Sequence, residues 1–484
     1  MFEFSSIEQY HAALKEGKTT CLQAVEHYLD RIRSASHLNA FIEVYASEAL
    51  QKARSLDQRR NAGHPARKLH GVVVGLKDVI CYKDHKLSAS SNILKNFTSL
   101  YSATAVERLL AEEAIIIGNC NCDEFAMGST NENSAYGRVL NALDETRVPG
   151  GSSGGSAVAV QAGLCMISLG SDTGGSVRQP ADFCGIIGLK PAYGRISRYG
   201  LIAYGSSFDQ IGIFGTTVYD VALALEVMAG PDEFDSTVSS TKVEKYTDLI
   251  GKKSKYRVAY FNEALDHSSL DPEISSSITG LIEKLNKDGH EVSPVEFDLL
   301  DYVVPAYYII TTAEASSNLS RYDGVRYGYR TQRKGINLTD FYKQSRSEGL
   351  GKEVKRRIML GTFVLSAGYY DAYFTKAQKV RSLLTKKIQL IFREFDFIIM
   401  PTSPATAFKA GEKTTDPIAM YLADIYTVIA NLAGIPSISV PLFSHSNGMP
   451  FGLQVMSNRF NEVHLLRFSN QMMQEQKAQP GKLK

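Results

Sequence analysis

The chain has 484 residues, with 53 Lys and Arg against 51 Asp and Glu and a formal net charge of +2. This balance argues against a protein that grips nucleic acid over a broad basic surface, so we expect any RNA contact to be local or made through a partner. Six cysteines without zinc-type pairing predict free thiols in a reducing cytoplasm, with neither disulfides nor a metal site.

The beginning of the chain predicts helices. Ser5 with Glu8, and Thr20 with Gln23, each resemble a capping box, and apolar residues follow at helical spacing. We therefore expect helices over about residues 1–66. We expect no signal peptide, because polar and apolar residues alternate there, and no run of the chain is long enough to span a membrane.

A buried strand is predicted over residues 68–80, where an apolar run carries the amine of Lys77 toward the interior. Because side chains alternate along a strand, Asp78 should point to the opposite side. A helix over 105–114 and a strand over 115–117 follow. Strands and helices alternating in this way indicate one sheet flanked by helices.

Two clusters of glycine and serine lie within residues 149–191, separated by an apolar run. The first, 150–156, predicts a flexible loop whose last serines cap a helix beginning near Ala157. A short buried strand is predicted over 164–169. The second cluster, 170–176, is then a loop that returns beside the first.

The second cluster has the composition of an anion site. The amides of Gly174 and Gly175 can converge on an anion, and Ser176 beside them resembles a nucleophile with its oxyanion hole. Ordinary turns also use glycine and serine. Two clusters that a helix and a strand bring together nevertheless favour a functional site.

The base that would activate such a serine is not an obvious histidine, since none lies between His85 and His267. Lys77 is the next candidate, although a lysine at a strand end is often only solvated. To act as a base near neutral pH its pKa must fall by roughly three units from about 10.4. Full burial can supply that shift, on the order of 4 kcal/mol.

The rest of the chain continues the α/β pattern to its end. The polar stretch 230–255 predicts an insertion or linker, and residues 476–484 predict a frayed tail. Between them we expect a strand over 256–261, a helix from Pro272 to Gly289, helices within 345–387, a strand over 397–400, and strands 438–442 and 451–456 joined by a hairpin at Asn447-Gly448.

Two readings outside this scheme stay open. The run 151–155 matches G-x-S-x-G, which would place Ser153 on the nucleophile elbow of an α/β-hydrolase, although such an elbow needs a strand directly before it and 141–147 is polar. Its base would be a later histidine: His267, His290, His445 or His464. A phosphate or nucleotide binder could use the same loops, but no G-x-x-x-x-G-K-[ST] is present.

Lys77, Ser152 and Ser176, with the serines 24 residues apart, resemble the amidase-signature family of Ser-cisSer-Lys amide hydrolases. The resemblance implies a large mixed β-sheet core flanked by helices in one domain over 1–484. It also implies that Ser176 is the acyl nucleophile, that Ser152 follows a cis peptide bond, and that Lys77 completes the proton relay. The oxyanion hole would consist of the amides of Thr173, Gly174, Gly175 and Ser176.

Four further stretches, 127–134, 188–200, 314–321 and 356–362, resemble one branch of that family, the glutaminase subunits of tRNA-dependent amidotransferases. This resemblance implies hydrolysis of glutamine and delivery of ammonia to partner subunits B and C, which amidate Glu-tRNA(Gln) or Asp-tRNA(Asn). ATP and Mg²⁺ would bind the partner, and this chain would need no cofactor. The alternative is a stand-alone amidase of the same family that acts on another amide.

The same resemblance implies an arginine, an acid and a tyrosine that hold the free amino acid, and the nearest matches are Arg357, Asp424 and Tyr308. The adjacent Arg356 and Tyr307 leave the register open by one residue. The two arginines could equally well lie on a solvated helix face, and Asp424 could equally well be an exposed charge with no ligand. The backbone of Gly128 and Ser129 is expected at the pocket wall.

Overall fold

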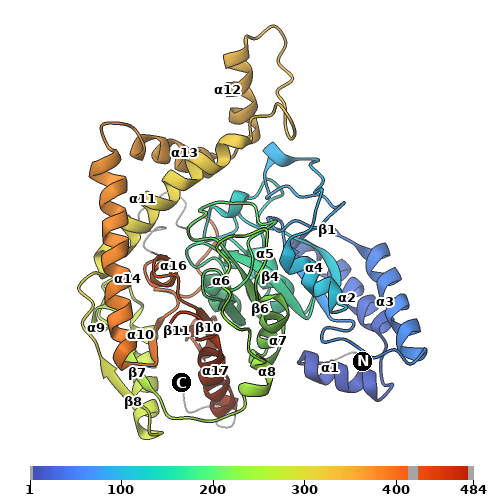
Figure 1. Cartoon of the computed structure of the whole chain (residues 1–484), viewed down its shortest axis with the longest axis vertical. Coiled ribbons are helices and arrows are strands. Elements are labelled where there is room, and N and C mark those ends of the chain that lie inside the picture. Colours follow the sequence, from blue (N-terminus) through green and yellow to red (C-terminus); the bar gives the residue numbers. More distant parts are fainter. Residues whose placement is uncertain (1–3, 413–422, 478–484) are drawn as a thin grey trace.

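The computed structural model describes residues 4–412 and 423–477, and its centre is one mixed sheet of 11 strands (Figure 1). The strand order is β1-β3-β2-β4-β6-β5-β10-β11-β9-β7-β8. The strands are β1 (Phe41–Val44), β2 (Val73–Lys77), β3 (Ile115–Cys120), β4 (Ile167–Asp172), β5 (Ile187–Lys190), β6 (Gln210–Gly215), β7 (Arg257–Tyr260), β8 (Glu291–Pro294), β9 (Phe397–Pro401), β10 (Ser437–Ser444) and β11 (Pro450–Ser457).

Helices cover both faces of this sheet. They are α1 (Ile7–Lys15), α2 (Cys21–Ser34), α3 (Ala46–Asn61), α4 (Thr104–Ala111), α5 (Gly154–Gln161), α6 (Arg178–Cys184), α7 (Val218–Met228), α8 (Tyr246–Leu249), α9 (Asn262–Leu265), α10 (Pro272–Lys287), α11 (Leu300–Asn318), α12 (Leu338–Gly349), α13 (Lys352–Val364), α14 (Lys376–Glu394), α16 (Val428–Leu432) and α17 (Glu462–Lys477). The predicted α/β class, a large mixed sheet flanked by helices, is confirmed.

The alternation of side chains along β2 divides the core. Val73 packs with residues of α2, α3, α5 and α6, whereas Val74 and Leu76 pack with residues of α4, α7 and α17 on the other face. β2 is parallel to both β3 and β4. The carboxyl ends of β2 and β4 therefore meet at one edge of the sheet, and these ends carry Lys77 and Asp172.

The caps of the N-terminal helices agree in part with those predicted from the sequence. Thr20 and Gln23 form the predicted capping box at the start of α2. Ser6, and not Ser5, caps α1 by accepting from the Gln9 amide. β1 was not predicted, because its four residues form a half-buried edge strand with no alternation to detect.

The boundaries around the serine loops also differ from the prediction. α5 begins at Gly154 instead of near Ala157, and no serine side chain caps it. The helix includes glycines because it packs closely against the end of β3. A Cβ on Gly155 would meet the Asn121 carbonyl oxygen at 2.3 Å. β2 is shorter than the predicted 68–80, and β4 starts later than the predicted 164–169 and runs to Asp172.

Most later elements are confirmed. Pro272 opens α10, capped by Asp271, and β10 and β11 pair as the predicted antiparallel hairpin. The helical region starts before 345, with α12, because Asn337 caps that helix. The polar stretch 230–255 contains only the short helix α8, the tail is helical through Lys477, and residues 478–484 lie outside the described residues.

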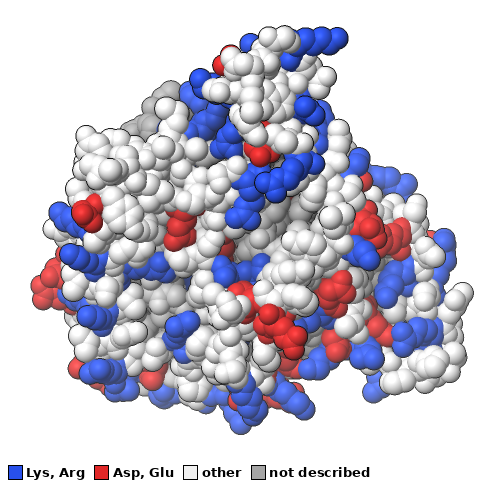
Figure 2. All heavy atoms as spheres, turned by 45° about the horizontal axis from the view of Figure 1, so that its top comes forward, with Lys and Arg blue, Asp and Glu red and all other residues white. Residues whose placement is uncertain are grey.

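Charge is distributed unevenly over the surface. Basic residues outnumber acidic ones over residues 321–357, the segment that contains the projecting helix α12. Figure 2 shows Lys and Arg side chains on this projection and around the hollow beneath it, with Asp and Glu gathered lower on the same face. All six cysteines are buried free thiols, as predicted. In the described part of the chain, no helix combines the length and apolar character needed to cross a membrane.

Candidate active site

Lys77 ends β2 with its side chain fully buried among serine hydroxyls. Its Nζ lies 2.7 Å from Ser152 Oγ, 2.9 Å from Ser153 Oγ and 2.8 Å from Ser171 Oγ. Burial lowers the pKa of Lys77 to about 8, since the charged amine loses its hydration. An uncharged amine has two N–H donors and one lone pair, so it can satisfy all three contacts while accepting one hydroxyl proton.

A second buried lysine shows why the contacts of Lys77 matter. Burial also lowers the pKa of Lys190, to about 7. The Lys190 amine donates to the carbonyl oxygens of Pro191, at 3.0 Å, and Ile435, at 2.5 Å. These acceptors carry no proton to remove. A lowered lysine pKa alone therefore does not identify the base, whereas contact with hydroxyl groups does.

Ser152 follows a cis peptide bond from Gly151. A Cβ on Gly151 would meet Asp123 Oδ2 at 2.2 Å and the Thr130 amide nitrogen at 2.7 Å, so only glycine fits between them. The loop that contains Gly128 and Ser129 thus continues directly against the serine loop. Ser129 thus directly precedes Thr130, whose amide nitrogen packs against Gly151, the residue before Ser152.

Ser176 lies half-buried in the turn between β4 and α6, and its hydroxyl hydrogen-bonds to no described residue. Of the four predicted oxyanion amides, that of Gly175 donates to Asp172 Oδ1 at 2.8 Å and is occupied within the loop. The amides of Thr173, Gly174 and Ser176 donate to no residue within 4–412 or 423–477. Three amides are therefore available to an oxygen atom of a ligand, one fewer than predicted.

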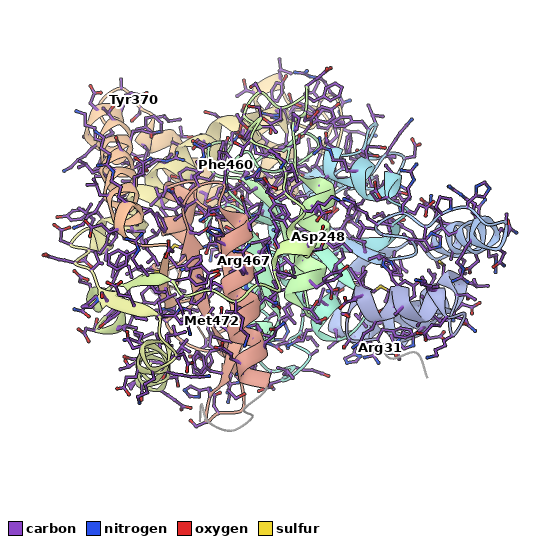
Figure 3. All side chains as sticks on the ribbon, turned by 60° about the horizontal axis from the view of Figure 1, so that its bottom comes forward. Arg31, Asp248, Tyr370, Phe460, Arg467 and Met472 are labelled. Carbon is purple, nitrogen blue, oxygen red and sulfur yellow. The ribbon has the colours of Figure 1, made fainter. Side chains whose placement is uncertain are left out.

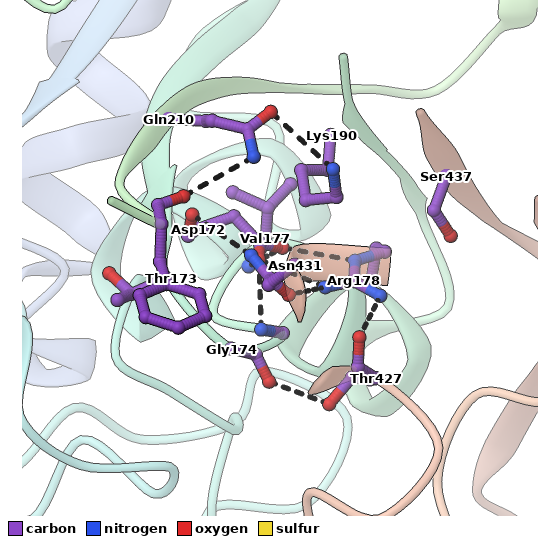
Figure 4. Close-up of polar contacts among 12 residues, drawn as sticks. Asp172, Thr173, Gly174, Val177, Arg178, Lys190, Gln210, Thr427, Asn431 and Ser437 are labelled. Carbon is purple, nitrogen blue, oxygen red and sulfur yellow. Dashed lines mark hydrogen bonds and ion pairs between the residues drawn. The ribbon is translucent and has the colours of Figure 1, made fainter. Parts of the chain in front are cut away.

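A buried ion pair holds this loop in place (Figure 4). Arg178 and Asp172 are both fully buried, and their closest contact is 2.9 Å. Burial raises the pKa of Asp172, but the charge of Arg178 outweighs it and holds that pKa at about 2. Arg178 also donates to the Thr427 carbonyl at 2.7 Å and to Asn431 Oδ1 at 2.6 Å.

The glycines of the loop pack against two residues from distant segments. A Cβ on Gly174 would meet Tyr307 Oη at 2.3 Å, and one on Gly175 would meet Thr427 Oγ1 at 2.3 Å. Thr427 Oγ1 also donates to the Gly174 carbonyl oxygen at 2.7 Å. Any side chain in place of these two glycines would displace the loop.

The structure brings the three predicted amino-acid ligands together. Tyr308 Oη donates to Asp424 Oδ2 at 2.6 Å, and the Arg357 guanidinium lies 5.4 Å from the centre of the Tyr308 ring. Arg357 also donates to Tyr204 Oη at 2.7 Å and to Glu353 at 2.7 Å. Burial raises the pKa of Asp424 to about 6, so this carboxyl group is ionised at neutral pH.

The register of these residues is clear from their contacts. Arg356 is exposed and pairs with Glu353 on the surface of α13, while Arg357 is buried. Tyr307 faces the glycine loop, while Tyr308 contacts Asp424. The choice of Arg357 and Tyr308 therefore agrees with the geometry.

Several residues that shape the site were not predicted. Ser153 and Ser171 complete the contacts of Lys77, and Thr173 Oγ1 donates to Asp209 at 2.6 Å. Asp172 and Arg178, which flank the glycine loop, were a signal in the sequence, because opposite charges on both sides of an apolar, glycine-rich loop suggest an internal ion pair. Asp209 gave no such signal.

The nucleophile-elbow reading does not fit this arrangement. Residues directly before Gly151 form no strand, and Ser153 Oγ donates to the Ser171 carbonyl oxygen. His267 bonds Ser269, His290 bonds the Tyr256 amide, and His445 pairs with Asp271. His464 lies beside the ring of Tyr256. Among the described residues, no group of three or more His, Cys, Asp and Glu is placed to hold a metal ion.

A buried amine bonded to serine hydroxyls, together with a serine loop that has free backbone amides, is typical of a serine-dependent acyl-transfer enzyme whose base is a lysine. Comparison with known proteins agrees with this class. The chain belongs to the amidase family, whose model matches residues 23–466.

Its relatives extend over its whole length. The chain is 50% identical over 476 residues to the A subunit of glutamyl-tRNA(Gln) amidotransferase from Chlorobium luteolum, covering 97% of both chains. The structure is similar to that of the same-named subunit from Thermotoga maritima, with a TM-score of 0.75, 38% identity and 92% of each chain covered. It is also similar to peptide amidase from Stenotrophomonas maltophilia, with a TM-score of 0.80 at 28% identity over 98% of this chain and 97% of that one.

Proposed function

We propose that this chain is the glutamine-hydrolysing subunit of a tRNA-dependent amidotransferase. The contact of Lys77 Nζ with Ser152 Oγ carries the proposal, because it places a proton acceptor in the serine cluster without a histidine. The likeness to amidotransferase A subunits over nearly the whole chain supports glutamine as the amide. A stand-alone amidase is the less favoured alternative, since the relatives named as amidases are less similar in sequence, at 26% and 28% identity.

The proposed reaction uses the two serines and the lysine in turn. Ser176 Oγ attacks the carboxamide carbon of glutamine and gives its proton to Ser152 Oγ, whose own proton passes to neutral Lys77. The oxygen of the tetrahedral intermediate accepts from the free amides of the 173–176 loop. Collapse breaks the C–N bond, and the proton held by Lys77 returns through Ser152 to the leaving ammonia. Water then releases glutamate from Ser176 by the same relay.

The substrate's own charges match the second cluster. The α-carboxylate of glutamine would pair with the Arg357 guanidinium, and its ammonium group with Asp424. Tyr308 orients Asp424 through its hydroxyl group. The side-chain amide would then extend toward Tyr307 and the glycine loop, against which Tyr307 packs.

The ammonia needs a recipient. We propose partner subunits B and C in the cytoplasm, with ATP, Mg²⁺ and the misacylated tRNA bound through the complex. The names of the relatives as subunits of one amidotransferase support an assembly of this kind. Co-expression with both partners should yield a stable complex that converts Glu-tRNA(Gln) with glutamine; a chain that stays alone and hydrolyses unrelated amides faster than glutamine would favour the stand-alone amidase.

Acylation at Ser176 is the direct test of the proposed nucleophile. We expect acid quenching during glutamine turnover to leave a γ-glutamyl ester on the peptide that contains Ser176, because its hydroxyl lies beside the three free amides. Mass spectrometry of the digested protein identifies the modified residue. A Ser176→Ala variant should show no ester, and an ester on Ser153 would contradict the assignment.

Asp424→Asn should weaken glutamine binding while leaving the chemistry intact. The amide keeps an acceptor for Tyr308 but removes the charge that pairs with the substrate ammonium group, so we expect KM to rise about 10- to 100-fold with kcat little changed. The wild-type KM should also rise as the pH falls below about 6, where Asp424 becomes protonated. Arg356→Ala, which removes an exposed charge one residue from Arg357, is the control and should leave KM unchanged.

A further inference from the structure

A cavity of about 870 Å³ lies on the side of the molecule away from the serine loops. Its walls come from α1, the end of α3, the segment 66–70, α7 and α8. Figure 3 labels Asp248 on α8, between the red-brown helix α17 and the blue N-terminal helices. His70, which lines the cavity, precedes β2, whereas Lys77 ends that strand, so the cavity and the catalytic serines lie at opposite ends of β2.

The rim of this cavity is basic. Lys15, Arg67 and Lys245 line it with exposed side chains, and none of the three forms an ion pair with a described residue. Of the two acids in the lining, Glu226 is already paired with Lys68 at 2.6 Å. The second acid, Asp248, is exposed and forms no ion pair with a described residue, so the rim offers three cations against one free acid.

His70 lines the cavity and is held in place by a buried acid. His70 is only 3% exposed, and its Nδ1 lies 2.5 Å from Glu113 Oε2. Burial raises the pKa of Glu113, but hydrogen bonds from His70 and the Arg67 amide outweigh it and lower that pKa, so this acid is ionised and Nδ1 carries a proton. Nε2 is buried without a hydrogen-bond partner in the described part of the chain. Because Nε2 also has almost no accessible surface, a ligand in the cavity does not reach it, and the His70–Glu113 pair is a fixed part of the wall.

The remaining wall is apolar and includes Tyr219, Leu14 and Leu223. Tyr219 is half-buried and the two leucines provide aliphatic surface. Small-molecule sites commonly have about 300–1,000 Å³, a largely apolar wall and a few polar groups at fixed positions. The cavity combines these three properties with a cationic rim.

We infer that this cavity binds a small phosphorylated ligand of the size and chemistry of a nucleoside monophosphate. The phosphate pairs with Lys15, Arg67 and Lys245 at the rim. The ring of the ligand packs on Tyr219. The site is independent of glutamine hydrolysis, because none of these residues touches the serine loops.

Isothermal titration of the purified full chain with 5′-AMP tests this inference, with adenosine and inorganic phosphate as separate titrants. We expect one AMP to bind per chain, and each fragment to bind at least about tenfold more weakly, since each makes only part of the contacts. AMP binding no tighter than adenosine would show that the cationic rim takes no part. No detectable binding of any titrant at millimolar concentration would overturn the site.

Variants locate the binding. Lys15→Ser combined with Lys245→Ser should weaken AMP at least about tenfold, whereas Lys95→Ser combined with Lys386→Ser removes the same charge elsewhere and should leave the affinity unchanged. Equal weakening by both lysine pairs would indicate attraction by net charge and would overturn the inference.

Discussion

Replacing Lys77 by methionine is expected to lower the rate of glutamine hydrolysis at least about a thousandfold. The aliphatic chain of methionine occupies similar space, but no group remains to accept the Ser152 proton. The fold should persist, because the amine forms no salt bridge with any residue in the described part of the chain, and its burial opposes the charged form. Lys77→Arg should fail nearly as badly, since a guanidinium group does not deprotonate.

The pH profile adds a test that a purely structural role would not affect. Because only the neutral amine accepts a proton, kcat/KM should rise about tenfold per pH unit below a pKa of about 8 and then level off. Lys190→Met is the matched control, since Lys190 has a lowered pKa but contacts no serine of the two loops. A profile whose inflection moves in Lys190→Met, or near-full activity in Lys77→Met at pH 8, would contradict the relay.

Arg178→Met should destabilise the protein by about 3–5 kcal/mol, because it leaves the Asp172 carboxylate buried without its counter-charge. The free energy of unfolding, measured with urea and circular dichroism, gives the change. Glutamine hydrolysis should fall as well, since Asp172 positions the Gly175 amide within the 173–176 loop. The loss of stability should be largest above about pH 4, where an ordinary aspartate is ionised, and should shrink as the pH falls toward the Asp172 pKa of about 2.

The double variant Asp172→Asn, Arg178→Met separates the ion pair from simple packing. With both charges removed, no uncompensated charge is buried, so the double variant should be more stable than Arg178→Met alone. If the two changes were additive in their effect on stability, the pair would not be coupled, and the loop would be held by its glycine contacts instead.

The sequence predicted the catalytic cluster better than the boundaries of the elements around it. The apolar run before Lys77 predicted that this lysine ends a buried strand, and the family resemblance paired it with Ser152; the two side chains lie 2.7 Å apart. The start of α5 was misplaced, because the contact of Gly155 with the Asn121 carbonyl is a tertiary constraint that local propensity does not contain. β1 was not predicted for a related reason, since the formation of a short edge strand depends more on its partner β3 than on its own residues.

The limits of sequence reasoning at the site have the same origin. Arg357 and Tyr308 could be named, but only their contacts separate them from Arg356 and Tyr307. The occupied Gly175 amide depends on the orientation of the Asp172 side chain, which no sequence pattern determines. Residues that match a family motif were thus predicted from the sequence. Residues that only position another residue, such as Asp172, were not.

The Arg178 contacts have a consequence for protein synthesis. Lys77, Ser152 and Ser176 all leave the ribosome early, yet Arg178 needs acceptors on Thr427, Asn431 and Gln454, which are translated last. A nascent chain that lacks this segment leaves the guanidinium group half-satisfied and the catalytic loop without its wall. The catalytic loop can therefore gain all of its Arg178 contacts only after residue 454 has been translated.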